Sequence, residues 1–195
     1  MPFWENALIP PSLVLLLFWP GWWPGPDPPA ATPADPTVGL AREFAYFYAP
    51  YVNSYKRYQA GTFAPTRIAW ALDNRTTGFR ACGEGPSLRV ENRIPGADAN
   101  PYLAFAATIA AGLHGIEKKL KPPPLYHGNA YEDGGLPQVP GSLREAVAAL
   151  EKSKVARAAF GEEVYEHYLH TARLELEALD KVVTSWELER NFERI

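Results

Sequence analysis

Three short segments in the middle of the chain, 67–72, 76–82 and 88–94, have the residue pattern of β-strands and are separated by turn-forming residues. In the last segment Arg89, Glu91 and Arg93 alternate with apolar or neutral residues. Successive side chains of a strand point to opposite faces, so these charged residues are expected to share one face. The short connections predict antiparallel pairing, because a parallel crossover ordinarily takes a dozen residues or more.

Apolar residues at helical spacing predict helices in the segments before and after these strands. Residues 37–50 predict a helix that Pro50 ends. After the strands, Asn100 is a suitable N-cap and Pro101 a suitable first helical residue. That helix has large apolar residues at helical spacing with alanines on its other sides, which predicts burial nearly all round. The large residues are Tyr102, Phe105, Ile109, Leu113 and Ile116.

Two capping boxes mark helices nearer the C-terminus. Ser142 with Glu145 opens a predicted helix through residue 150, and Thr184 with Glu187 opens a last helix that runs to the C-terminus. A longer helix is predicted between them, from near residue 162 to about 183. Short antiparallel strands followed by a C-terminal helical region place the fold in the α+β class.

Residues 1–36 differ in composition from the rest of the chain. An apolar run at 12–18 leads into a stretch rich in tryptophan and proline. The run is much shorter than the roughly 20 apolar residues that a membrane-spanning helix needs, and no basic region precedes it as in a secretory signal. We therefore expect an atypical leader outside the domain, a domain over residues 37–195, and no membrane association.

Composition and charge narrow the classes of function. The chain has 195 residues, 47% of them hydrophobic, which suits one domain with a sizeable core. Its net charge of -3 argues against nucleic acid as a partner. The single cysteine, Cys82, has no partner for an internal disulfide, so a reducing, cytoplasmic location is expected.

Candidate chemistry concentrates in the predicted strands. Arg75, Arg80, Arg89 and Arg93 are expected to surround one acid, Glu91. Guanidinium groups suit phosphate and carboxylate ligands, and the acid suits a divalent metal held between phosphate oxygens. A surface ladder of cross-strand ion pairs is the competing interpretation.

Four blocks of sequence resemble the C-terminal part of the catalytic domain of the glutamine synthetase family. They occur in order and at compatible spacings within a resemblance that covers about residues 40–195. In that family ATP phosphorylates the side chain of glutamate, and ammonia or an amine displaces the phosphate. The blocks are Asn53-Ser54-Tyr55-Lys56-Arg57, Asp73-Asn74-Arg75, Arg89-Val90-Glu91-Asn92-Arg93 and Pro95-Gly96-Ala97-Asp98-Ala99-Asn100-Pro101-Tyr102-Leu103.

The resemblance implies a role for each of these charged residues. Arg75 and Arg80 would meet the transferring phosphoryl group, which makes Arg75 the catalytic candidate. Phosphoryl transfer depends on positioning and on cations that neutralise developing charge, and arginine holds a carboxylate in a two-pronged geometry that lysine lacks. By this resemblance, glutamate would be held by Arg57 and Arg93. ATP would be met by Arg75, Arg80 and Arg89. An active-site Mg²⁺ or Mn²⁺ ion would be bound by Glu91.

Phe63 stands where ammonia-using members of the family carry a glutamate, six residues after the implied substrate arginine Arg57. In its context, 61–65, and with Trp70 and Asp73, it looks like the branch that joins glutamate to amines or polyamines. A phenylalanine cannot bind or deprotonate ammonium, but it can pack against an alkyl amine. The resemblance therefore implies that Phe63 sets acceptor specificity.

The parts of the family that carry its N-terminal β-grasp domain, its Glu-x-Glu metal motif and its Asn-Gly-Ser-Gly-x-His block have no counterpart in this chain. The resemblance thus implies a fragment of an ATP-dependent glutamate–amine or glutamate–ammonia ligase that is inactive alone. The alternatives to this function are a non-catalytic subunit or interaction module, or a non-functional truncated gene product. Family members form homo-oligomeric rings, so the implied partners are ATP, glutamate, an amine or ammonia, and related subunits.

Overall fold

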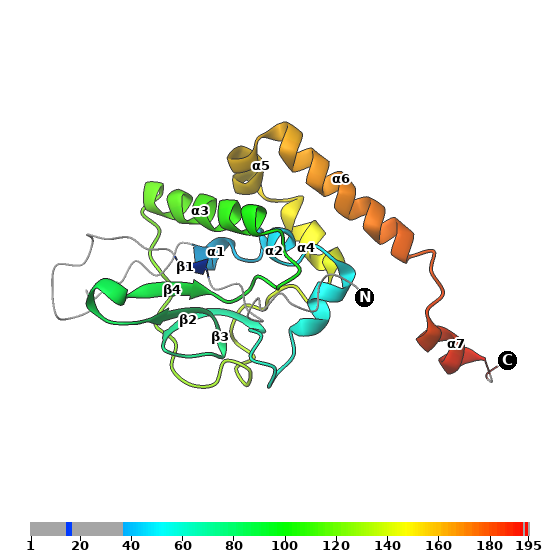
Figure 1. Cartoon of the computed structure of the whole chain (residues 1–195), viewed down its shortest axis with the longest axis horizontal. Coiled ribbons are helices and arrows are strands. Elements are labelled where there is room, and N and C mark those ends of the chain that lie inside the picture. Colours follow the sequence, from blue (N-terminus) through cyan, green and yellow to red (C-terminus); the bar gives the residue numbers. More distant parts are fainter. Residues whose placement is uncertain (1–14, 17–36, 193, 195) are drawn as a thin grey trace, which may run out of the picture.

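The computed structural model describes residues 15–16, 37–192 and 194, and places a small sheet beneath a layer of helices (Figure 1). The α+β class is confirmed. The predicted leader falls almost wholly on 1–14 and 17–36, outside the described residues, so its separation from the domain stays a prediction. None of the helices in the described part of the chain combines the length and the apolar character that crossing a bilayer requires.

The sheet has the strand order β1-β4-β3-β2 in the described part of the chain. β2 (Arg67–Leu72), β3 (Thr77–Cys82) and β4 (Arg89–Asn92) lie where strands were predicted, and β1 is Leu15–Leu16. A short 3₁₀ turn, η2 (Gly85–Ser87), joins β3 to β4. The antiparallel pairing predicted for β3 and β4 is confirmed, with Arg80 opposite Glu91.

The antiparallel pairing predicted for β2 and β3 is wrong, because these strands are parallel. The prediction assumed a long crossover, but five Cα–Cα steps from Leu72 to Thr77 cover up to about 17 Å. That length suffices to return along a six-residue strand, which is also about 17 Å long. Asp73 turns the chain back with a left-handed φ of 46°, and its N–H donates to the carbonyl of Ala81 at 2.8 Å.

The helix predicted over residues 37–50 divides into α1 (Thr37–Leu40) and α2 (Ala45–Tyr48). Between them the backbone changes from an i−4 hydrogen bond, from the N–H of Phe44 to the carbonyl of Leu40, to a tighter i−3 bond, from the N–H of Ala45 to the carbonyl of Arg42. A 3₁₀ helix, η1 (Val52–Arg57), follows and ends at Arg57.

Helix α3 (Pro101–Glu117) begins as predicted, because the side chain of Asn100 accepts from the N–H groups of Tyr102 and Leu103. The prediction that α3 is buried nearly all round is wrong. The elements that pack against it, α1, α2 and α5, cover only its alanine side. Its large apolar residues are exposed: Tyr102, Phe105, Ile109, Leu113 and Ile116.

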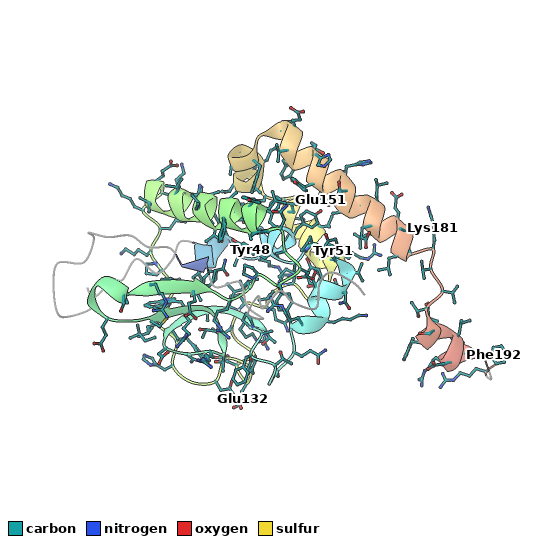
Figure 2. All side chains as sticks on the ribbon, in the orientation of Figure 1. Tyr48, Tyr51, Glu132, Glu151, Lys181 and Phe192 are labelled. Carbon is teal, nitrogen blue, oxygen red and sulfur yellow. The ribbon has the colours of Figure 1, made fainter. Side chains whose placement is uncertain are left out.

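The C-terminal region contains α4 (Leu143–Leu150), α5 (Lys154–Phe160), α6 (Glu162–Leu179) and α7 (Ser185–Asn191). Ser142 caps α4, and the capping box of Thr184 and Glu187 opens α7 as predicted. The predicted long helix ends at Leu179, a few residues earlier than expected, and α5 was not predicted. Figure 2 shows Phe192, just after α7, at the far end of a C-terminal extension from the body of the molecule.

The core lies between the sheet and the helices. Phe79 of β3 is fully buried, and the rings of Phe47 and Phe160 stack with their centroids 4.4 Å apart. On β4, Asn92 faces this core, and its side-chain amide donates to the hydroxyl of Thr108 on α3 at 3.2 Å. Strand alternation therefore turns Glu91, the preceding residue, to the opposite face of the sheet.

We expect Phe79→Ala to lower the free energy of unfolding by about 3–5 kcal/mol, because it opens a cavity in the core between β3 and the helices. Phe192→Ala makes the same truncation at an exposed side chain and is expected to change stability by less than about 0.5 kcal/mol. Urea unfolding followed by circular dichroism measures both values. Equal effects of the two substitutions would contradict this location of the core.

Candidate active site

Glu91 lies on the face of the sheet opposite the helical core and is only 5% accessible. The Nη1 of Arg80 lies 3.1 and 2.9 Å from its two carboxylate oxygens. The Nη2 of Arg89 is 3.4 Å from Oε1, and the Nη1 of Arg93 is 3.8 Å from Oε2. We call these four residues the Glu91 cluster. The prediction that Arg89, Glu91 and Arg93 share a face is confirmed.

The charges of the Glu91 cluster depend on one another. Burial by itself would raise the pKa of the Glu91 carboxyl, but hydrogen bonds from Arg80 and Cys82 and the charges of Arg80 and Arg89 bring that pKa below its usual value. Burial lowers the pKa of Arg93, and the charge of Arg80 lowers it further while Glu91 opposes the change. One buried carboxylate thus faces a crowded set of cations.

Two further residues, Asp73 and Cys82, contact the Glu91 cluster, and neither was assigned to it from the sequence. The carboxylate of Asp73 accepts from the Nε of Arg80 at 2.9 Å, and the thiol of Cys82 donates to Glu91 at 3.3 Å. The strand register could have indicated Cys82, because it pairs with Arg89. Asp73 could not be found in this way, since its position depends on the left-handed turn after β2.

The remaining predicted residues lie at two edges of the cluster. Arg57 donates to the carbonyl of Ile94, the residue after Arg93, and stacks over the ring of Tyr58 with its Cζ 4.7 Å from the centroid. Arg93 donates to the carbonyl of Phe63 at 2.8 Å. The structure therefore brings Arg57, Arg93 and Phe63 to the same end of β4.

Phe63 lies in a strained loop with its side chain outward. Its φ of 59° is left-handed, a conformation that non-glycine residues rarely adopt. Its side chain is 64% exposed. The loop is held by its backbone, since Arg93 binds the carbonyl of Phe63 and the hydroxyl of Tyr131 donates to the neighbouring carbonyl of Ala64 at 3.1 Å.

Arg75 is not joined to the Glu91 cluster. It lies on the loop after β2, where its side chain is exposed and makes no ion pair with another described residue. Its charge nevertheless acts on Arg93, whose pKa it lowers slightly after the larger effects of burial and of Arg80. The expectation that Arg75 lines the same site therefore stays a prediction.

The described residues do not by themselves form a metal site. Glu91 offers one carboxylate whose oxygens both face guanidinium groups. Over the described ranges there is no group of three or more His, Cys, Asp and Glu side chains suited to a metal ion. A divalent cation usually takes several oxygen ligands, so Glu91 would need further ligands to hold one.

Comparison with known proteins agrees with this geometry. Residues 37–191 match the model of the glutamine synthetase catalytic domain. The chain is 56% identical over 154 residues to the γ-glutamylethanolamide synthetase of Streptomyces coelicolor, a match that covers 79% of this chain and 33% of that protein. It is 44% identical over 156 residues to a glutamate–isopropylamine ligase from Pseudomonas sp., covering 78% of this chain and 34% of that one.

Solved structures give the same result. A complex of GmaS with ADP aligns with a TM-score of 0.73 at 30% identity, covering 82% of this chain and 38% of that one. This chain therefore belongs to the glutamine synthetase family, and its most similar relatives include glutamate–amine ligases. It spans about a third of the length of the curated relatives that it matches.

Replacing the buried acid by its neutral isostere tests the electrostatics of the cluster. We expect Glu91→Gln to destabilise the protein by about 3 kcal/mol at neutral pH, since it leaves buried guanidinium groups uncompensated. Because the pKa of Glu91 is lowered on folding, this stability is complete above its ordinary value of 4.5 and is lost as the pH falls through the lowered value.

Chemical denaturation at a series of pH values measures this difference between wild type and Glu91→Gln. Glu189→Gln removes the same charge from an exposed position on α7 and serves as the control, with little expected effect at any pH. A difference for Glu91→Gln that stays constant from neutral pH down to pH below 4.5 would contradict the coupling.

Proposed function

We propose that this chain carries the glutamate- and nucleotide-binding arginines of an ATP-dependent ligase that joins the side chain of glutamate to an amine or ammonia. The observation that supports this most is the Glu91 cluster, because it lies inside the segment that matches the glutamine synthetase catalytic domain. The names of its relatives, γ-glutamylethanolamide synthetase and glutamate–isopropylamine ligase, favour an amine as acceptor.

In this proposal Arg57 and Arg93 bind glutamate. Both guanidinium groups are anchored at the end of β4. The Nε of Arg93 is buried and has no hydrogen-bond partner among the described residues, so it can donate to a carboxylate ligand without breaking an existing bond. Gly96 supports Arg57 at close range, since a Cβ there would overlap the carboxylate of Asp98 and lie 3.4 Å from the Nε of Arg57.

Arg75, Arg80 and Arg89 bind the phosphates of ATP in the same proposal. Arg80 and Arg89 are fixed by Glu91, which orients them before a ligand arrives. Arg75 is exposed and unpaired among the described residues, so it is suited to meet the transferring phosphoryl group and neutralise its charge as the catalytic residue.

Glu91 would contribute a ligand to Mg²⁺ or Mn²⁺ only together with oxygen ligands from outside the described residues. Those ligands, and much of the nucleotide site, would come from the two thirds of the relatives' length that this chain does not match. The whole activity, a cytoplasmic location and assembly with related subunits into a ring belong to the same proposal.

We expect the purified chain to form no glutamine or γ-glutamyl amide from ATP above background, because one acid cannot supply the cation chemistry of phosphoryl transfer. A chimera of the Streptomyces relative, in which residues 37–191 of this chain replace the matching segment, is expected to be active. In the chimera Arg93→Ala should lower kcat/KM about 100-fold or more. Arg190→Ala on α7, an exposed arginine, should leave it unchanged.

Coupled ATP hydrolysis and mass spectrometry of the γ-glutamyl product measure these activities. A chimera that folds and assembles like its parent yet makes no product would contradict the ligase assignment. Turnover by the isolated chain would contradict only the expectation that it is inactive alone.

Phe63 provides a separate test of the acceptor. Its carbonyl is held by Arg93 while its ring is exposed, so the ring can pack on the methylene groups of an amine next to the glutamate site. In the chimera we expect Phe63→Glu to shift the ratio of kcat/KM values from ethanolamine toward ammonia by about tenfold, the equivalent of about 1.4 kcal/mol.

Steady-state assays with ethanolamine, isopropylamine and ammonia give this ratio. Ala60→Glu adds the same charge at an exposed position of the same loop and is expected to leave the ratio unchanged. A chimera that prefers ammonia before any substitution would show that Phe63 does not set acceptor class.

A further inference from the structure

A pocket of about 210 Å³ lies in the helical layer, between α2, the start of α3 and α6. This layer covers the face of the sheet opposite the Glu91 cluster (Figure 1), so the pocket is separate from the candidate active site. The aromatic rings of Tyr46, Phe47, Tyr51 and Tyr168 line it, together with Glu175 of α6. We call these five residues the aromatic pocket.

The rings of the aromatic pocket stand at steep angles to one another. Tyr46 and Phe47 have their ring centroids 5.6 Å apart at an interplanar angle of 65°. Phe47 and Tyr168 have theirs 6.0 Å apart at 81°. Rings at such angles form walls in different directions around one space. Because the face of each ring carries negative potential, walls of this kind are how proteins recognise organic ammonium ions.

The polar groups of the aromatic pocket are acceptors that lack a cation. Among the described residues that line the pocket there is neither lysine nor arginine, and His167 is the one lining side chain that can take up a positive charge. The carboxylate and the three tyrosine hydroxyls of the pocket have no hydrogen-bond or ion-pair partner in the described part of the chain. A ligand with several N–H donors and a positive charge would satisfy these groups together.

These groups lie close enough to influence one another. Burial, and then the proximity of Tyr168, Tyr51 and Glu175, raise the pKa of Tyr46 to about 12. The hydroxyl of Tyr46 therefore stays neutral near neutral pH and can accept a hydrogen bond, while Glu175 supplies the negative charge. The oxygen atoms of the pocket thus converge on one space with one net negative charge.

We propose that the aromatic pocket binds a small organic ammonium ion with a short alkyl stem. The carboxylate of Glu175 and the tyrosine hydroxyls accept hydrogen bonds from the ammonium group, and the rings pack on the stem. The pocket is smaller than the roughly 300–1,000 Å³ of sites for drug-sized ligands, which favours an ion of a few heavy atoms. This site lies apart from the Glu91 cluster, and the proposal does not depend on the proposed ligase function.

Thermal unfolding of the full chain at increasing concentrations of isopropylammonium chloride tests this site. Isopropanol has nearly the same shape without the charge, and sodium chloride at equal concentration controls for ionic strength. The charge variant is Glu175→Gln and its matched control is Glu177→Gln, because both residues are exposed on α6 and only Glu175 lines the pocket. The ring variant is Tyr51→Leu and its control is Tyr102→Leu, at an exposed tyrosine outside the pocket.

We expect isopropylammonium to raise the Tm saturably above the value in sodium chloride, and isopropanol to have no such effect. The dissociation constant should rise about tenfold in Glu175→Gln and in Tyr51→Leu, and stay unchanged in the two controls. Each variant is compared with its own Tm without ligand, so that a loss of stability is not mistaken for a loss of binding.

Three results would overturn the proposal. These are no saturable effect on the wild type, an equal effect of isopropanol, or equal affinities within either pair of variant and control. Because the measurement involves no ligase reaction, its failure would leave the proposed function standing, and an inactive chimera would leave this site standing.

Discussion

A single buried carboxylate allows three guanidinium groups to lie together on one face of this sheet. Without the negative charge of Glu91, Arg80, Arg89 and Arg93 would repel one another in a partly desolvated setting, where charge interactions are stronger than in water. The carboxylate is held in its ionised form by these same arginines. The arrangement is thus mutually dependent, and it keeps positive groups fixed and available for an anionic ligand.

Strand β4 connects this charged face to the helical core. Arg89 and Glu91 of the strand form the Glu91 cluster with Arg93, which follows it, and Arg80 of β3. Asn92 faces the other way and binds Thr108 of α3. The small residues on the inner side of α3 let α1, α2 and α5 pack against that helix, and Thr108 among them meets Asn92 of β4. The position of the arginines is therefore coupled to the packing of α3, although no cluster residue lies on a helix.

Local rules predicted the parts of the structure that depend on neighbouring residues. The helix starts at Asn100 and Thr184 follow from side chains that cap the nearest N–H groups, and the shared face of Arg89, Glu91 and Arg93 follows from strand alternation. The family blocks supplied the roles of these residues, which spacing alone did not.

The failures concern backbone conformation and non-local packing. The parallel pairing of β2 and β3 depends on the left-handed turn at Asp73, a conformation that the residue type permits but does not require. Phe63 is left-handed against its own preference, so no local pattern indicates it. The exposure of the large apolar residues of α3 was missed because apolar periodicity indicates which side of a helix avoids water, not which element covers that side.

The position of Cys82 has a consequence for following this protein in solution. It is the only cysteine in the chain, and burial, followed by its hydrogen bond to Glu91, raises the pKa of its thiol. Little reactive thiolate is present at neutral pH while the cluster is intact. The rate at which an alkylating reagent labels Cys82 therefore reports how often the sheet opens at Glu91. Cys82 is thus a native probe of whether the charged face is assembled.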